Sequence, residues 1–338
     1  MRSRLLSPRA RWSGAAILVA ILATADGAAA QSDRGALSRD AFDALVHRVD
    51  NAGRWGAGDQ SGTLNHITPE VRRAAAAEVR AGLTISLGRE FVAGAVEGAF
   101  EPAGIDFLIV SDSLLGPSDG SAVWTAERLT IIYHGWAFSH VDAPSHISYK
   151  GRGYNGPATR SAAGEPERNR VDAMRDGIVT RGVLVDVPRL RDVPFVEGSA
   201  VVTPADLTAW EERTGVRVGA GDVVLFRGGR GSTEAARAGA SAFAALHPTA
   251  AEWLHERGVA AVGVDASADP GTSLVAGITS PFHVLALVAM GMPIFENLDL
   301  EVLAGEAANR SQWTFMFVAA PLDIRGGTGS PLNPLAVF

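Results

Sequence analysis

The segment HGWAFSHVDAPSH, His134–His146, holds three of the chain's eight histidines together with an aspartate. His140 and Asp142 are two residues apart, so an extended backbone points both side chains the same way. An imidazole and a carboxylate on one face suit a divalent metal, and a nearby histidine outside the metal shell can carry a proton. Pro144 favours a turn that returns His146 to that space. The alternative is a loop whose side chains make only local hydrogen bonds.

The apolar run RLTIIYHG (128–135) predicts a buried strand that delivers these residues inside the protein rather than onto a solvated surface. Capped helices are predicted over Ser38–Asp50, Thr68–Gly82, Thr203–Gly215 and His247–Gly258, and a buried apolar helix over Ser280–Gly291. Further buried strands are predicted for LTISLG, IDFLIVSD, TRGVLVDV, GDVVLFRGG and VAAVGVD. Strands and helices mixed along the chain, without a repeat or a linker, predict one α/β domain.

The first thirty residues predict a secretory signal peptide. Four arginines precede the apolar stretch Ala15–Ala25, and Ala28–Ala30 offers small residues for cleavage. An N-terminal membrane anchor is the alternative, but the apolar stretch is short for a membrane span. We therefore expect a secreted, periplasmic protein whose mature chain begins near Gln31 and whose residues 31–338 form the functional domain.

Charge and cysteine content limit the partners and the chemistry. Loss of residues 1–30, which carry four arginines and one aspartate, lowers the formal net charge from −7 to −10. Nucleic acid is therefore not an expected partner, and no other segment has the length of a membrane span. The chain has no cysteine, so disulfides and thiolate chemistry are excluded and any metal must bind His, Asp, Glu, Asn or Gln side chains.

The motif SHVDAPSH resembles the signature H-x-G-T-H-x-D-x-P-x-H of the cyclase family of metal-dependent hydrolases, which includes bacterial kynurenine formamidase and isatin hydrolase. The resemblance implies a swivelling β/β/α fold with a small barrel-like mixed sheet in a single domain, and a homodimer or homotetramer. Other segments look like longer members of that family in the same order, covering most of residues 50–305: WGAGDQSGTLNHITPE, YKGRGYNG, GDVVLFRGG, WLHERGVAAVGVD and PFHVLALVAMGMPIFENLDLE.

The resemblance also implies roles for particular residues. His140 and Asp142 match two metal ligands of the signature, and His146 matches its general acid/base. His283 and Glu296 lie where the formamidases place a further histidine and glutamate at the metal. Thirteen positions separate these two, where twelve are expected. The alternatives are a buried histidine bonded to a backbone carbonyl and a capping or surface acid.

One position departs from the signature. Four residues before the first matched ligand the chain has Trp136, and an indole cannot bind a metal. His134, two residues further upstream, cannot be assumed to replace it. We therefore expect one divalent ion, Mn or Zn, rather than two, with Trp136 lining the pocket. The other residues expected to line the substrate pocket are His134, Trp55, Tyr154 and Asp265, although Asp265 alternatively caps a turn.

These residues predict a metal-dependent hydrolase of a small formamide, cyclic amide or lactone. The metal would lower the pKa of water and polarise the substrate carbonyl, while His146 would move the proton from the water to the leaving group. Two other functions use the same residues. One is a periplasmic binding protein for a small ligand, which needs no acid/base histidine, and the other is a metal-dependent cyclase or dehydratase.

Overall fold

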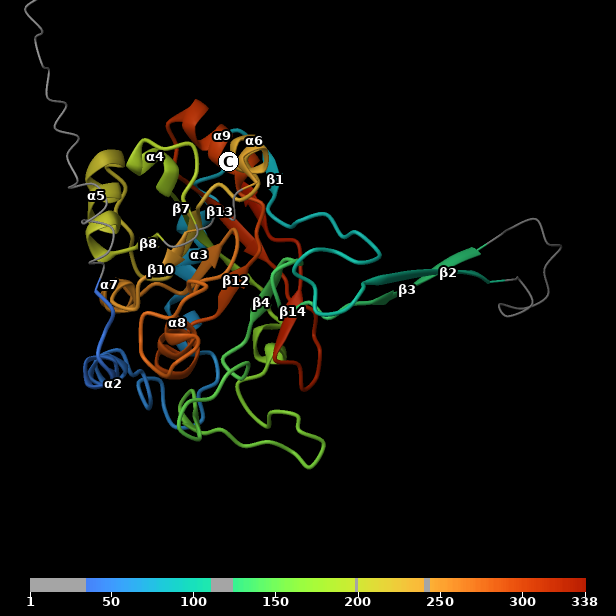
Figure 1. Ribbon diagram of the computed structural model, residues 1–338, viewed down its shortest axis with the longest axis vertical. Helices are drawn as coiled ribbons and strands as arrows, with labels where there is room; N and C mark the ends of the chain where they lie inside the picture. The colour runs from blue at the N-terminus through green and yellow to red at the C-terminus, as the bar shows by residue number, and fades with distance from the viewer. Residues whose placement is uncertain (1–34, 111–123, 198–199, 240–243) are drawn as a thin grey trace, which may run out of the picture. The chain divides into compact units, whose positions relative to one another are not determined.

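A nine-stranded mixed sheet organises the described part of the chain, which comprises residues 35–110, 124–197, 200–239 and 244–338 (Figure 1). The structure is a computed structural model, and the predicted signal peptide lies outside the described residues. The sheet curls into a half-barrel. Its strands follow in space the order β1 (Thr84–Ser86), β15 (Leu335–Val337), β13 (Thr314–Ala319), β7 (Ile178–Asp186), β9 (Val223–Arg227), β11 (Ala261–Val264), β12 (Ile294–Glu296), β4 (His140–Asp142) and β14 (Gly329–Pro331).

The four strands β7, β9, β11 and β12 pair in parallel, and the strands on both sides of them pair antiparallel. The parallel strands are almost continuously apolar because both faces of the sheet are covered. Alternate residues of β7 show this directly. Val183 and Val185 belong to the apolar core on one face, and Leu184 belongs to the core on the other.

Helices and short helical turns cover the two faces. One core includes Trp210 of α5 and Phe282 of α8, and the other includes Leu303 of α9. The helical elements are α2 (Arg39–Arg48), η1 (Gly62–His66), α3 (Pro69–Ala76), η3 (Val171–Met174), α4 (Val187–Arg191), α5 (Pro204–Thr214), α6 (Thr233–Ala238), α7 (Ala250–Glu256), α8 (Pro281–His283), the π-helical segment η4 (Val284–Met290) and α9 (Glu301–Arg310). None of these described helices is long and apolar enough to cross a membrane.

Caps and apolar runs account for the elements that the sequence predicts. Ser38 and Thr203 accept backbone N–H groups at the starts of α2 and α5, as N-caps do. The apolar helix expected over Ser280–Gly291 is confirmed, and every residue of η4 is buried. The helix expected over Thr68–Gly82 is shorter than predicted, since α3 ends at Ala76.

Three small two-stranded sheets lie outside the main sheet in the described residues. They are β2 (Gly104–Val110) with β3 (Trp124–Thr130), β5 (Arg152–Gly153) with β6 (Gly156–Pro157), and β8 (Val201–Val202) with β10 (Ala245–Leu246). The prediction that IDFLIVSD is a buried strand is wrong, because β2 forms with β3 a hairpin that projects from the body (Figure 1), and Phe107 is 68% exposed. The prediction of a buried strand over 128–135 is wrong as well, because β3 ends at Thr130 and Leu129 is 61% exposed.

Candidate metal centre

The pairing of β4 with β12 sets three side chains next to one another. His140 and Asp142 point to the same face of β4, and the antiparallel register places Glu296 opposite His140. His140 Nε2 lies 3.4 Å from Asp142 Oδ1 and 4.0 Å from Glu296 Oε2. Val141, between the two ligand candidates, points into the apolar core instead. The sheet register, rather than a flexible loop, therefore fixes this part of the site.

A second histidine reaches the same carboxylates from the last residue of the short helix α8. His283 Nε2 lies 3.5 Å from Asp142 Oδ2 and 3.4 Å from Glu296 Oε1. The atoms that Asp142, His283 and Glu296 could offer a metal all lie within 4.8 Å of one another. The four metal ligands that the family resemblance implies are thus brought together, with Asp142 between the two histidines.

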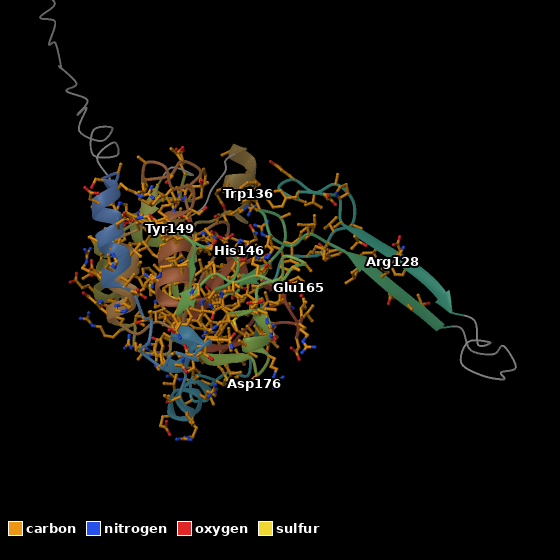
Figure 2. All side chains as sticks on the ribbon, turned by 90° about the horizontal axis from the view of Figure 1, so that it is seen from below. Arg128, Trp136, His146, Tyr149, Glu165 and Asp176 are labelled. Carbon is orange, nitrogen blue, oxygen red and sulfur yellow. The ribbon has the colours of Figure 1, made fainter. Side chains whose placement is uncertain are left out.

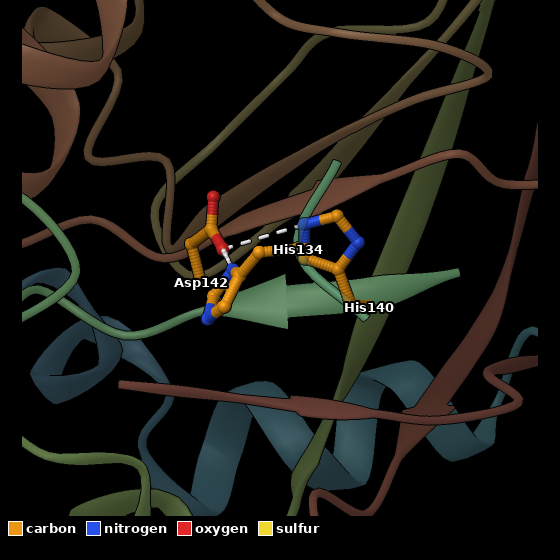
Figure 3. Close-up of side chains that lie close together, drawn as sticks. All are labelled: His134, His140 and Asp142. Carbon is orange, nitrogen blue, oxygen red and sulfur yellow. Dashed lines mark ion pairs between the residues drawn. The ribbon is translucent and has the colours of Figure 1, made fainter. Parts of the chain in front are cut away.

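His134 completes a second group of three around the same aspartate. Its Nδ1 lies 2.9 Å from Asp142 Oδ1 (Figure 3), and His134, His140 and Asp142 also form a set within 4.8 Å. The chain reaches this position because β3 ends early and Gly135 takes a φ of +126°, where a side chain is disfavoured. Trp136 was expected to leave the centre with one ligand fewer than the family signature has. His134 places a nitrogen atom beside Asp142, where it could serve as a further ligand.

Trp136 itself is 54% exposed and contacts the Phe100 ring, with 5.9 Å between ring centroids. Figure 2 labels it together with His146 and, on the projecting hairpin, Arg128. An exposed indole at this position is compatible with the predicted pocket-lining role and is no part of the ligand set.

The donor set fits a cation. Asp142 is only 1% exposed, and among the described residues neither of its carboxylate oxygens accepts a hydrogen bond. His134 Nδ1 is buried without a hydrogen bond as well. A buried carboxylate that accepts no hydrogen bond is costly even with histidines close by, and a bound divalent metal would supply the missing interaction.

The other ring nitrogens of two candidate ligands are occupied. His140 Nδ1 donates to the Phe138 carbonyl at 2.8 Å, and His283 Nδ1 donates to Asp269 Oδ2 at 2.6 Å. Each bond leaves Nε2 as the acceptor that faces the carboxylates. Metal-binding histidines are usually oriented in this way by a carbonyl or a carboxylate.

The charges in the centre are strongly coupled. Burial raises the pKa of Asp142, but the neighbouring histidines outweigh burial and hold that pKa well below its usual value. Burial lowers the pKa of His283, but the carboxylates around it, with Glu296 first, raise that pKa well above its usual value. A positive charge among these residues would offset the negative charge of the carboxylates, and a bound metal cation would supply it.

His146 lies beside the ligands but is not one of them. Its ring stacks on His134 with 4.1 Å between centroids, and its centroid is 6.4 Å from that of His283. Among the described residues, no side-chain hydrogen bond joins the His146 ring to the rest of the chain. Burial lowers the pKa of His146 to about 4, so the ring is neutral at pH 7 and can accept a proton.

With this geometry in view, the family follows from the sequence profile described as "Putative cyclase", which matches residues 83–269, more than half of the chain. The chain belongs to this cyclase family. A search of curated protein sequences finds no match.

Solved structures agree with this assignment. A crystal structure described as a novel cyclase shares 28% identity and a TM-score of 0.75, covering 87% of this chain and 99% of its own. Isatin hydrolase A from Ralstonia solanacearum shares 25% identity and a TM-score of 0.51, covering 80% and 97%. Isatin hydrolase A from Labrenzia aggregata, solved with benzyl benzoate, shares 22% identity and a TM-score of 0.52 over 78% and 94%, and shows the fold alone. The expected cyclase-family α/β fold is therefore confirmed.

The remaining candidate pocket residues of this cyclase-family chain take other positions. Asp265 is buried, and its Oδ2 accepts the backbone N–H groups of residues 228–230, so it fixes the loop after β9. The Tyr154 hydroxyl donates to Asp59 Oδ2 at 2.8 Å, and its buried ring packs on Gly291. Trp55 stacks edge-on against His66, with 5.3 Å between centroids. These contacts do not bring Tyr154 or Trp55 to the metal centre, and their substrate roles stay predictions.

The sequence analysis missed the residues that support the ligands. Asp269 accepts the backbone N–H groups of Phe282 and His283 in addition to the His283 ring. Ala268 N donates to Glu296 Oε1 at 2.8 Å. Both belong to the segment that follows β11, and the carboxyl ends of parallel strands are where ligands bind in α/β sheets. The aspartate at the end of this segment could have been flagged on that ground.

Asn297 is the second missed support. It takes a left-handed φ of +55° directly after Glu296, and its Nδ2 donates to the carbonyls of Gly135 and Phe138. Phe138 is the residue whose carbonyl also orients His140. Asn297 therefore ties the ligand strand β12 to the loop that carries His134 and leads to His140.

Proposed function

We propose that this protein hydrolyses a formamide, cyclic amide or lactone bond in a small molecule with the help of a divalent metal. The observation that carries the proposal is the buried Asp142 carboxylate, which lies among three histidines and Glu296 and accepts no hydrogen bond from the described residues. Membership of the cyclase family and the likeness to isatin hydrolase A support a metal-dependent hydrolase.

The residues divide into holding and proton-moving groups. His140, Asp142, His283 and Glu296 would hold the metal, with His134 next to Asp142. When bound, the metal supplies Lewis-acid polarisation and a more acidic water. His146 is neutral at pH 7, so its ring can take the proton of the attacking water and return it to the leaving nitrogen or oxygen.

The donor types suit Mn or Zn, since imidazole favours Zn and carboxylate oxygen favours Mn. A single ion was expected because Trp136 replaces a ligand histidine of the family signature. His134 supplies a nitrogen beside Asp142, so two groups of three donor residues share Asp142 and could hold one ion or two. Elemental analysis of the purified protein decides the number.

We also propose that the protein is a homodimer or homotetramer. A two-stranded hairpin is marginally stable alone, and the β2–β3 hairpin exposes Phe107 and Leu129. Another copy of the chain would cover these side chains. A monodisperse, active monomer in light scattering would contradict this proposal.

A substrate screen tests the activity. Metal-loaded protein should hydrolyse at least one member of a panel of N-formylanilines, isatin-like lactams and small lactones, and a chelator should abolish the activity until Mn or Zn is returned. Hydroxylated precursors in the same panel would reveal a cyclase or dehydratase instead. Metal-free protein that binds no divalent ion and cleaves no member of the panel would contradict the proposal, and tight binding of a panel member without turnover would favour a binding protein.

A further inference from the structure

Two arginines beside the metal centre have no carboxylate partner. Arg230 Nη1 donates to Asn297 Oδ1 at 2.8 Å, and its Nη2 donates to the Trp136 carbonyl at 2.6 Å. Among the described residues no ion pair is formed by Arg230 or by Arg89. The Nε atom of Arg89 is buried, and it has no hydrogen-bond partner in the described part of the chain.

Arg227, three residues before Arg230 and at the end of β9, gives a comparison, because its charge is paired with carboxylates. Its guanidinium contacts Asp186 at 2.9 Å and Glu301 at 2.7 Å, so its charge is fully paired. Arg230 has Asp265 close by, but Asp265 Oδ2 is used by backbone N–H groups and its Oδ1 has no partner. Among the described residues, the Arg230 side chain donates to two neutral oxygens instead.

Both arginines are attached to segments that carry metal ligands. The backbone N–H of Arg89 donates to Ser139 Oγ, and Ser139 directly precedes His140. Ser139 Oγ in turn donates to the carbonyl of Asn297, the residue after Glu296 and the one that binds Arg230. Ser139 and Asn297 therefore join the two arginines to each other and to the metal centre.

The two guanidinium groups also act on each other. Burial lowers the pKa of Arg230, and the positive charge of Arg89 lowers it further, while the nearby carboxylates oppose this effect. Holding two like charges together is unfavourable unless an anion lies between them, and a buried N–H without an acceptor adds to the cost. Two neighbouring arginines without a carboxylate partner among the described residues suit an anion.

We infer that Arg89 and Arg230 bind a carboxylate group of the substrate, separate from the bond that is cleaved. The guanidinium fork matches a carboxylate in a planar, two-bonded geometry, which fixes the substrate relative to the metal. The inference rests on the proposed hydrolase function and narrows its substrates to acidic amides or lactones. Trp136, whose carbonyl holds Arg230, places an exposed indole next to this site for an aromatic ring of the same substrate.

Two substrates with the same scissile bond test this inference: N-formylaniline and 2-formamidobenzoate, which adds only a carboxylate. The wild type should prefer 2-formamidobenzoate. Arg89→Gln and Arg230→Gln should each lower kcat/KM for it about 10- to 100-fold, mainly through KM, because each removes a charged hydrogen bond. Both variants should lose much less activity on N-formylaniline than on 2-formamidobenzoate, because N-formylaniline has no carboxylate for the arginines to bind. Arg128→Gln, on the projecting hairpin, is the matched control and should change neither substrate.

Equal losses on both substrates, or a wild type without preference for the acid, would overturn the inference. If neither compound is hydrolysed, the proposed function fails for formamides, and calorimetry with benzoate and benzamide still tests the arginines. Metal-loaded wild type and Arg128→Gln should then bind benzoate more tightly than benzamide, and the Arg89→Gln and Arg230→Gln variants should lose that difference. Unchanged benzoate binding in both variants, or no binding by the wild type, would overturn the inference.

Discussion

The β4–β12 pair and the β2–β3 hairpin are both antiparallel ladders, but they treat charged side chains in opposite ways. The hairpin pairs Asp106 with Arg128 directly across the ladder at 2.9 Å, with both side chains more than half exposed. The β4–β12 pair sets His140 opposite Glu296, and both are buried. The longer ladder thus carries a conventional surface ion pair, and the shorter one carries the candidate chemistry.

Burial accounts for the difference. Solvent weakens the hairpin pair, so it contributes little to stability. In the sheet, covered on both faces, the same kinds of groups interact strongly, and they require a cation or proton to offset the carboxylates. The burial of the β4–β12 pair, rather than the number of paired residues, therefore makes it a candidate site.

The largest expected effect is that of removing the central charge. Asp142→Asn should abolish metal binding and lower turnover by about 10³-fold or more, because the metal contributes several kcal/mol to the transition state. Elemental analysis and steady-state kinetics on an active panel substrate measure both effects. Retained metal and turnover would remove Asp142 from the centre of the site.

The second effect separates proton transfer from metal binding. His146→Ala should keep the metal and lower kcat by about 10²- to 10⁴-fold, the usual contribution of a positioned acid/base. His140→Ala, the comparison variant, should lose metal. If His146→Ala loses metal as well, His146 is a ligand, and if it keeps full turnover, the acid/base role is wrong.

The support of His283 should matter less than the ligands themselves. Asp269→Asn keeps the size of the side chain but weakens the bond to the His283 ring, so metal affinity should fall about 10- to 100-fold. Competition against a chromogenic chelator measures this affinity. Thermal unfolding of the metal-free variant is the control, and a large loss of stability without loss of affinity would indicate a merely structural aspartate.

A carboxylate in the packed body, away from the metal, should show its effect through pH. Burial raises the pKa of Asp206, but bonds from the Thr203 backbone and hydroxyl and from Arg191 outweigh it and lower that pKa. Its stabilisation is therefore present above the unfolded value and lost as pH falls through the folded one. Asp206→Asn should cost about 1 kcal/mol at pH 7, and denaturant unfolding at pH 3 should show a smaller difference. A constant difference across this range would contradict the assignment.

The smallest effect is expected on the hairpin. Arg128→Gln removes an exposed ion pair and should change the free energy of unfolding by less than about 1 kcal/mol, with no change in metal content. Urea unfolding of the two proteins makes the comparison. A large destabilisation would mean that the hairpin is packed against something the isolated chain does not show.

Local rules predict most of the elements but not how exposed they are. The caps at Ser38 and Thr203 and the apolar run of β9 are local signals, and the structure confirms the elements that they predict. The apolar composition of β2 indicated burial as well, but Phe107 of this strand is 68% exposed. Burial depends on neighbours that composition does not specify.

The site also contains residues that the sequence predicts and residues that it does not. The two-residue spacing of His140 and Asp142 predicts a shared face, and the family resemblance adds His283 and Glu296. His134 could not be assigned, because its position depends on where β3 ends and on the loop conformation at Gly135. Asn297 acts through contacts with Gly135 and Phe138, which are far away in the sequence, and a single sequence gives no sign of such contacts. For Asp269 the only sign in the sequence is its place after β11.

The central claim is that a metal sits at Asp142, and anomalous X-ray scattering tests it most directly. Crystals of Zn- or Mn-loaded protein, measured at the absorption edge of the metal, should show a peak about 2.0–2.3 Å from an Asp142 oxygen and from at least one nitrogen of His134, His140 or His283. A second peak on the other side of the carboxylate would show that two ions are bound. An anomalous map without a peak among these residues, from crystals whose metal content is verified, would contradict the account.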